Sequence, residues 1–291
     1  MAHHESQVAV SEPQPLGTPS VRPAVAARPV AKPGLWLSTG TLWWREIRSF
    51  YRQRSRVIGG LATPLVFWLL LGSGFGTSLR TSGAGGADYL KFFFPGTLTL
   101  VILFTAIFSN ISIIEDRREG FLLSVLVAPV SRLALVLGKI LGATTIGVLQ
   151  GALLLPLAPL AGLSVNLGQV PALLGCMVLV AFGLTGLGFF FAWWLNSVQG
   201  FHSVMNVVLL PMWLLSGAVF PPEGASVWVR WVMAVNPLTY GVGALQHFFS
   251  AEQASSAPSF GVSVAVMIAF AVATLAAAYY QATRRSAENL S

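Results

Sequence analysis

The sequence predicts an all-α integral membrane protein with six transmembrane helices. Hydrophobic residues make up 55% of its 291 positions and charged residues 9%, against about 25% charged residues in a soluble domain. One core cannot hide that much apolar surface, so lipid must surround most of the chain. Crossing the hydrocarbon takes about 20 mostly apolar residues, and six runs meet this length: 57–79, 92–114, 133–160, 170–195, 201–220 and 260–280.

The positions of Lys and Arg predict which side of the membrane each connection occupies. Most of them flank the first span, the connection 115–132 or the C-terminus, namely Arg45, Arg48, Arg52, Arg54, Arg56, Arg117, Arg118, Arg132, Arg284 and Arg285. The opposite side has Arg80, Lys91 and Arg230. Basic residues concentrate on the cytoplasmic side, so we expect a protein of the cytoplasmic (inner) membrane with both termini in the cytoplasm. The net charge of +7 is explained in this way, without a nucleic-acid partner.

The two ends of the chain are predicted to lie outside the bilayer core. Residues 1–34 are rich in Pro and poor in aromatic residues, which is typical of a disordered cytoplasmic tail. Residues 286–291 form a short C-terminal tail. Between the first tail and the first span, residues 35–55 predict an amphipathic helix lying in the membrane interface. Its apolar residues are Trp36, Trp43, Ile47, Phe50 and Tyr51, whereas Arg45, Arg48, Ser49 and Arg52 fall mostly on the other side. The alternative is a surface helix packed on another domain.

Residues 221–258 are predicted not to cross the membrane. Their apolar pieces are short and break at Asn236-Pro237, so a re-entrant or outer-interface pair of helices fits them better, with irregular backbone covered by protein. The alternative is a seventh crossing at 225–249. That crossing would place Arg230 and His247 in or near lipid and the C-terminus outside.

Motifs for chemistry are absent from the sequence. Gly138-Lys139 is followed by Ile140, so no phosphate-binding loop is present and the chain is expected not to hydrolyse nucleotide by itself. No Cys or His cluster predicts a metal site, and the single Cys176 excludes an internal disulfide. The predicted spans contain no Asp or Glu. Lys139, the ionised residue well inside a span, is expected to extend its ammonium group toward the cytoplasmic edge.

The connection 115–132 places five charged residues, Glu115 to Glu119, between two apolar spans. Glu115 or Asp116 is expected to cap a short helix with an apolar body over 121–127, which Pro129 ends. An apolar helix in the cytosol needs a cover. That cover is either a groove on a partner protein or the chain's own amphipathic helix, and the residues alone leave the two alternatives open.

A family resemblance favours the partner. The stretch "EDRREGFLLSVLVAPVSRLALVLGKIL" resembles the cytoplasmic-loop signature of the ABC type-2 transporter permeases. "MNVVLLPMWLLSGAVFPPE" followed by "WVRWVMAVNPLTYGVGAL" is similar to the second hallmark of that family. The resemblance covers residues 35–285, which form one transmembrane domain, and it points to the daunorubicin-resistance and nodulation-type exporters.

The resemblance implies a permease subunit without its own ATPase site and without a cofactor, because ATP binds to a separate subunit. Two permease chains would pair, as homo- or heterodimer, above two ATP-binding subunits, within membrane lipids and without nucleic acid. The cargo would be amphiphilic: a drug, a lipid or a lipid-linked saccharide. The residues that would couple to the ATPase are Glu115, Asp116, Arg117, Arg118, Glu119, Gly120, Arg45, Glu46 and Arg48. The implied pathway residues are Phe104, Phe108, Asn110, Met205, Asn206 and Met212, and Asn236, Pro237 and Tyr240 would form an outer gate.

Three rival functions stay open at the level of the sequence. The first is an ion-coupled carrier or channel, disfavoured by the predicted acid-free spans. The second is a membrane enzyme or assembly factor, which lacks a recognisable polar catalytic cluster. The third is the same ATP-driven assembly serving as a regulator or as a sodium, copper or haem-related system.

Overall fold

The structure is a computed structural model, and it describes residues 34–81, 86–128, 130–249 and 257–288. Within these ranges all regular elements are helical. The predicted tail 1–34, apart from Gly34, lies outside the described residues. The predicted all-α class is confirmed for the described part of the chain.

Six described helices are long and apolar enough to cross a membrane, which confirms the predicted number. The candidate spans are Arg54–Gly72, Tyr89–Arg118, Arg132–Ala161, Leu167–Trp194, Val198–Ala218 and Phe260–Arg284. They lie in α2 (Arg54–Thr81), α3 (Gly86–Arg118), α5 (Arg132–Ala152), α6 (Val170–Trp194), α7 (Val198–Trp213) and α11 (Phe260–Glu288). Each predicted apolar run therefore corresponds to one long helix or to a helix with a short extension.

Some boundaries differ from the predicted ones for local reasons. The third run, 133–160, is not one helix, because α5 gives way to a 3-10 helix, η1 (Leu155–Ala161), which contains Pro156 and Pro159. Proline lacks the amide hydrogen that an α-helix needs. The fifth run ends in a kinked turn, η3 (Leu214–Ala218), where Gly217 has φ 79°. At the C-terminus, α11 continues to Glu288, into the predicted tail 286–291.

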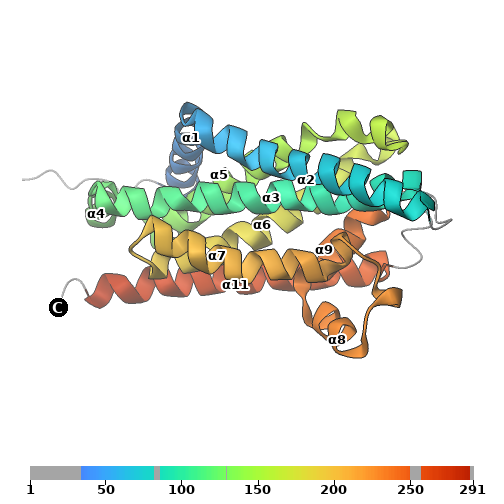
Figure 1. Cartoon of the computed structure of the whole chain (residues 1–291). Helices are drawn as coiled ribbons and strands as arrows, with labels where there is room; N and C mark the ends of the chain where they lie inside the picture. Colours follow the sequence, from blue (N-terminus) through green and yellow to red (C-terminus); the bar gives the residue numbers. More distant parts are fainter. Residues whose placement is uncertain (1–33, 82–85, 129, 250–256, 289–291) are drawn as a thin grey trace, which may run out of the picture. The chain divides into compact units, whose positions relative to one another are not determined.

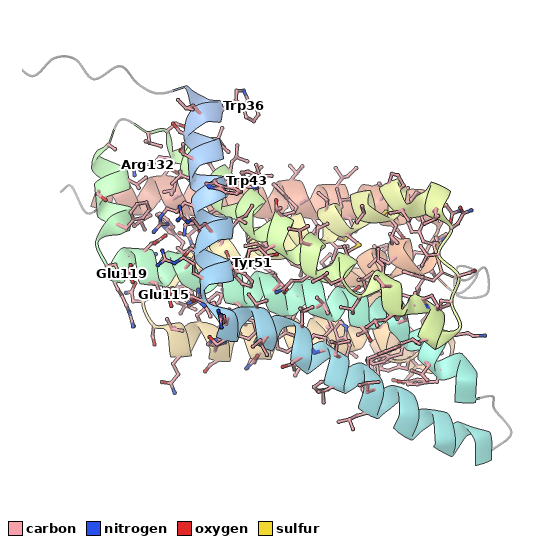
Figure 2. The ribbon with its side chains drawn as sticks, turned by 90° about the horizontal axis from the view of Figure 1, so that it is seen from above. Trp36, Trp43, Tyr51, Glu115, Glu119 and Arg132 are labelled. Atoms are coloured by element: carbon pink, nitrogen blue, oxygen red, sulfur yellow. The ribbon has the colours of Figure 1, made fainter. Side chains whose placement is uncertain are left out.

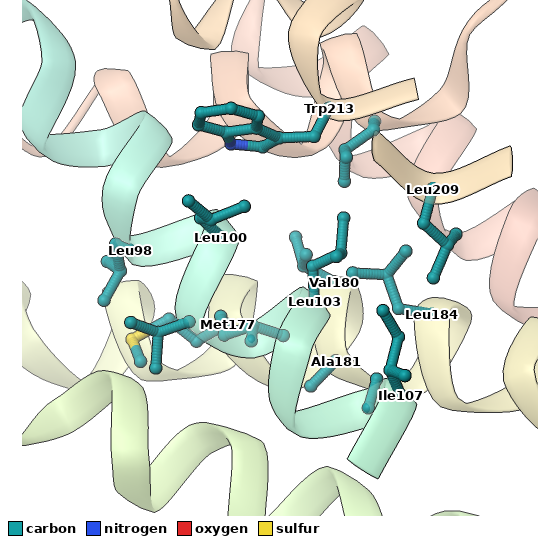
Figure 3. Packing of buried hydrophobic residues seen from close by; sticks show 14 of the residues in the cluster. Leu98, Leu100, Leu103, Ile107, Met177, Val180, Ala181, Leu184, Leu209 and Trp213 are labelled. Atoms are coloured by element: carbon teal, nitrogen blue, oxygen red, sulfur yellow. The ribbon is translucent and has the colours of Figure 1, made fainter. Parts of the chain in front are cut away.

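Helix α3 is the central element of the fold. It packs against α2, α5, α6 and α7, and these helices run alongside it in Figure 1. Most of its span is buried, whereas α2 and α11 expose most of theirs. Figure 3 shows Leu100, Leu103 and Ile107 of α3 packing with Val180 and Leu184 of α6 and with Leu209 and Trp213 of α7. The exposed apolar residues of the outer helices are the surface that lipid would cover.

Two short elements leave the direction of the long helices. The predicted amphipathic segment 35–55 is α1 (Leu35–Arg52), which crosses the neighbouring helices steeply in Figure 2 and packs mainly on α5. The predicted short helix of the 115–132 connection is α4 (Phe121–Val127), at the end of α3 in Figure 1. Its N-cap is Gly120 with φ 75° and without a side-chain cap, so the expected cap by Glu115 or Asp116 is wrong.

The segment before the last span forms two short helices, α8 (Val227–Val235) and α9 (Pro237–Gln246), joined at Asn236. Neither reaches the length of a candidate span, so a single crossing helix over 225–249 is not formed. The break falls at Asn236-Pro237, as predicted. Residues 241–246 of α9 are buried, whereas α8 exposes Trp228 and Trp231.

Candidate functional site

A buried ionic cluster joins α1, α3 and α5 beside α4. The Lys139 ammonium lies 2.5 Å from Asp116 Oδ2 and 2.7 Å from Glu46 Oε2, and it donates a hydrogen bond to Ser112 Oγ at 3.0 Å. Arg45 donates two hydrogen bonds to Asp116, at 2.5 and 2.9 Å, and Ser112 donates one to Glu46. Two cations thus balance two carboxylates, which is the condition for keeping charges away from water.

The cluster corrects two expectations about the spans. Lys139 is 4% exposed, so its ammonium does not reach the surface of the described chain but is paired inside it with two carboxylates. The second span also continues through Glu115 and Asp116 to Arg118, so the spans are not free of acidic residues. Both corrections have one cause: paired charges are tolerated where an isolated charge is not.

Two glycines bring α1 close enough to α5 to form the cluster. A Cβ atom on Gly138 would lie 2.6 Å from Leu42 Cβ, and one on Gly142 would lie 2.6 Å from Glu46 Cβ. Gly138 and Gly142 are four residues apart, so they lie on the same side of α5. Lys139 comes between them in the sequence. This close approach places the Glu46 carboxylate directly against the Lys139 ammonium.

The nine predicted coupling residues fall into three groups. Asp116 and Glu46 are buried in the cluster, at 4% and 2% exposure. Arg45, Glu115 and Arg117 are half-buried, whereas Arg48, Arg118, Glu119 and Gly120 are exposed. The structure therefore brings most of these residues to one end of the helices but exposes only some of them.

The half-buried residues contact the chain itself. Arg45 also lies over the Phe121 ring of α4, 3.5 Å from its centroid, and the hydrogen bond to Asp116 raises the pKa of Arg45 above its ordinary value. Glu115 forms an ion pair with Arg56 of α2. Arg117 donates to the Trp193 and Leu195 carbonyls at 2.8 and 3.2 Å, which caps the end of α6. The chain's own helices thus cover Asp116 and partly cover Glu115 and Arg117, whereas Arg118 and Glu119 stay exposed.

The predicted pathway residues do not share one surface. Asn110 of α3 is buried and donates to the Thr185 carbonyl of α6 at 3.3 Å and to the Ala106 carbonyl at 2.7 Å, so it joins two helices of the same chain. Met205 is fully buried. Phe104, Phe108 and Met212 are half-buried, and Asn206 is exposed. Four of the six residues therefore remain within reach of another molecule.

The predicted gate residues join α8 and α9 to the end of α7. Asn236 donates to the Met212 and Leu215 carbonyls at 2.6 and 2.9 Å, and its Oδ1 accepts from the Leu238 amide as the N-cap of α9. Pro237 is the first residue of α9. Tyr240 donates to the Ala234 carbonyl of α8 at 2.8 Å. The junction between α8 and α9 is therefore attached to backbone carbonyls at the end of α7, where the kink at η3 leaves them without helical partners.

The sequence reasoning noticed Lys139 but missed its pairing inside the protein, and it missed Ser112 altogether. The signal was present in "GKILG", where two small residues four apart flank a lysine. Small residues at this spacing mark a close helix contact, and an ionised residue in a span calls for a named partner. The identity of the partner could not be read from the sequence, because Glu46 lies on a separate helix.

The fold and the cluster define a multi-pass membrane protein with a short helix held at one end of its spans. The family model described as "ABC-2 type transporter" matches residues 38–250, which is more than half of the chain. The chain belongs to this family, and it is a membrane transport permease subunit. The family works with an ABC ATP-binding partner in general.

Relatives carry names of the same kind. The chain is 26% identical to a "Putative transport permease ycf38" of Cyanophora paradoxa, over 68% of this chain and 69% of that protein. It is 26% identical to "Nodulation protein J" of Rhizobium leguminosarum bv. trifolii, over 74% and 82%. It is 25% identical to the "Probable multidrug ABC transporter permease YbhR" of Escherichia coli K12, over 53% of this chain and 42% of that protein.

Proposed function

We propose that the chain is the permease subunit of an ATP-driven exporter of the cytoplasmic (inner) membrane. A separate ATP-binding subunit would dock at the end of the helices where α4 lies. The observation that carries the proposal is the attachment of α4 to the spans. An exposed turn, Arg118 to Gly120, comes directly before α4, and Phe121 of α4 contacts Arg45. Arg45 in turn is paired with Asp116 of the buried cluster.

The cluster provides a physical route from the docking turn to the spans. Lys139, Asp116 and Glu46 are buried, and both carboxylates pair with the Lys139 ammonium. Separating α1, α3 and α5 at this point would leave buried charges without partners, which costs several kcal/mol of free energy. The three helices therefore move together. A force applied to α4 or α1 is transmitted to α3 and α5, and nucleotide at the partner shifts the balance between two permease states.

The cargo would be an amphiphilic molecule: a drug, a lipid or a lipid-linked saccharide. The name of one relative, a probable multidrug ABC transporter permease, supports a drug-like cargo. The pathway would run between two permease chains along α3 and α7, using the reachable residues Phe104, Phe108, Asn206 and Met212. Asn110 and Met205 would support these helices from within.

The orientation follows from the basic residues and the docking turn together. Both termini and α4 would face the cytoplasm, and α8 and α9 would form a re-entrant or outer-interface pair. Asn236, Pro237 and Tyr240 would hold this pair as an outer gate at the end of α7. The exposed indoles of α8 suit the membrane interface.

Reconstitution tests the proposal. The chain is placed in lipid vesicles with and without a candidate ABC ATP-binding subunit from the same organism, and export of a fluorescent amphiphile is followed. We expect transport that requires both proteins and Mg-ATP. Transport by the chain alone, driven by a proton or sodium gradient, would establish the ion-coupled alternative instead.

A further inference from the structure

A surface of basic and aromatic residues extends from the second half of α1 to the start of α2. Its cations are Arg48, Arg52 and Arg54, which are exposed. Its aromatic residues are Trp44 and Tyr51, which are 59% and 42% exposed. Figure 2 shows Tyr51 at the end of α1, where α2 begins. These five residues are called the basic–aromatic surface below.

The α1 part of this surface lies on the side of the helix that faces away from α5. Trp44, Arg48 and Arg52 are spaced by four residues, so they follow one another along one side of α1. Successive helical residues are about 100° apart, so Glu46 and Phe50 fall on the roughly opposite side, where both are buried. Because α1 packs mainly on α5, the basic–aromatic surface is the side that α1 presents outward.

The three arginines of the surface form no ion pair with a described acidic residue. The nearby carboxylates are paired with other cations: Glu46 with Lys139, Glu115 with Arg56, and Asp116 with Lys139 as well as with a cation of α1. Helix α2 adds positive charge, because its first turn contains no acidic residue and the N-terminal end of a helix carries a partial positive charge. An anion on this surface would therefore meet positive charges that nothing in the described chain balances.

The surface is continuous with the side of α2 that lipid would cover. Ile58 is 62% exposed and comes four residues after Arg54, so it lies one turn further along the same side of α2. The span that begins at Arg54 exposes most of its apolar residues. Trp and Tyr side chains are favoured at the depth of the lipid headgroups. The arginines therefore stand at the edge of an apolar surface, which is where the phosphate groups of a bilayer lie.

We propose that the basic–aromatic surface binds an anionic phospholipid of the cytoplasmic leaflet. Arg48, Arg52 and Arg54 hold the phosphate-bearing headgroup, and the acyl chains run along Trp44 and Ile58. A guanidinium group donates paired hydrogen bonds to a phosphate, and cations beside a span attract anionic lipids. A soluble acidic protein would leave the apolar side chains uncovered. The inference rests on the proposed orientation, with α1 on the cytoplasmic side.

Lipid binding to the purified full-length chain tests the inference without an ATP-binding subunit. The chain is stripped of lipid in detergent, and binding of phosphatidylglycerol and of phosphatidylcholine is titrated by native mass spectrometry. We expect Arg48→Gln combined with Arg52→Gln to weaken phosphatidylglycerol binding about 25-fold, since each cation near a membrane surface contributes about fivefold. Phosphatidylcholine binding should not change. The matched control combines Arg230→Gln with Arg284→Gln, which removes two exposed arginines elsewhere, and it should bind phosphatidylglycerol within about twofold of wild type.

A second measurement uses the wild-type chain and does not depend on the folding of a variant. Hydrogen exchange of residues 48–56 is compared in nanodiscs of phosphatidylcholine with and without phosphatidylglycerol. We expect phosphatidylglycerol to slow this exchange about threefold or more, because a bound headgroup orders the end of α1 and the start of α2. Exchange in α11, on a separate part of the described chain, should stay the same.

The outcomes separate this inference from the proposed function. Equal exchange in the two nanodiscs, or equal loss of phosphatidylglycerol binding in the two double variants, would overturn the lipid inference and leave the proposed function standing. Slowing that inorganic phosphate reproduces would assign the arginines to a soluble anion, and slowing that requires an added ABC ATP-binding subunit would assign them to that protein; either result overturns the inference. In a Cys176→Ala background, a Tyr51→Cys chain that reacts with an impermeant maleimide only from outside the cell would overturn both the inference and the proposed orientation.

Discussion

Replacing Lys139 by Met removes the cation that two buried carboxylates share. Met has a similar length and no charge, so the change isolates the ionic contribution. Asp116 keeps its two hydrogen bonds from Arg45, whereas Glu46, which is 2% exposed, keeps only its bond from Ser112. The variant thus leaves one buried carboxylate without a cation.

The expected cost follows from that single uncompensated charge. Removing one partner of a buried ion pair costs about 3–5 kcal/mol, and we expect Lys139→Met to lower the free energy of unfolding by this amount. Glu46→Gln should cost less, about 1.5–3 kcal/mol, because Lys139 still lies 2.5 Å from Asp116. The double variant removes both charges and keeps the Arg45–Asp116 pair. It should be more stable than Lys139→Met alone, with a coupling energy of about 2–3 kcal/mol, the upper part of the range for contacting residues.

The assay is unfolding by sodium dodecyl sulfate in mixed micelles, followed by tryptophan fluorescence. Wild type, the two single variants and the double variant form a complete cycle. A loss below about 1 kcal/mol for Lys139→Met, or strictly additive effects in the cycle, would show that the three charges do not share a dry environment. The proposed transmission through the cluster would then lose its physical basis.

Three further predictions address the helix contact, the junction and the docking turn. Gly142→Ala should destabilise the protein by about 1–3 kcal/mol through overpacking, measured in the same unfolding assay. The control Gly175→Ala, where a Cβ meets nothing within 4 Å, should be neutral or stabilising. Equal effects of the two variants would contradict the close approach of α1 to α5. Asn236→Ala removes three hydrogen bonds, so it should lower stability by about 1.5–4 kcal/mol and speed hydrogen exchange in α8 and α9. The control Asn206→Ala, at an exposed position, should change stability by less than about 0.5 kcal/mol. Unchanged exchange in Asn236→Ala would argue against Asn236 as the residue that attaches α8 and α9 to the end of α7. Glu119→Arg, at an exposed position, should uncouple ATP hydrolysis from transport in reconstituted vesicles without changing stability, and normal transport by this variant would count against docking at the turn.

The number and positions of the spans were predictable because the signal for them is local. A run of about 20 apolar residues is sufficient for a helix that crosses a bilayer, and each of the six runs corresponds to one candidate span. The break at Asn236-Pro237 was predictable for the same reason, because proline cannot continue the preceding helix. The boundary errors, such as the end of α5 before Pro156, arose where the backbone changes within an apolar run.

The rotation of each span about its axis was not predictable. A helix surrounded by lipid and protein is apolar on all sides, so its sequence does not show which side faces a neighbour. Asn110 illustrates this limit: as a polar residue on α3 it was a reasonable pathway candidate, but its side chain faces α6. Met205 is a second example, because it was a pathway candidate but lies on the buried side of α7.

The sequence by itself determined the all-α membrane class, the six crossings, the short helix between the second and third of them, and the membership that its motifs indicated. These follow from composition and from runs of neighbouring residues. Only the tertiary structure decided that Lys139 meets Glu46 and Asp116. It also decided that Asp116 is buried whereas Arg118 and Glu119 of the same connection stay exposed. Ser112 and Glu46 are 66 residues apart, and contacts over such separations depend on how helices pack, which no local pattern of residue types specifies.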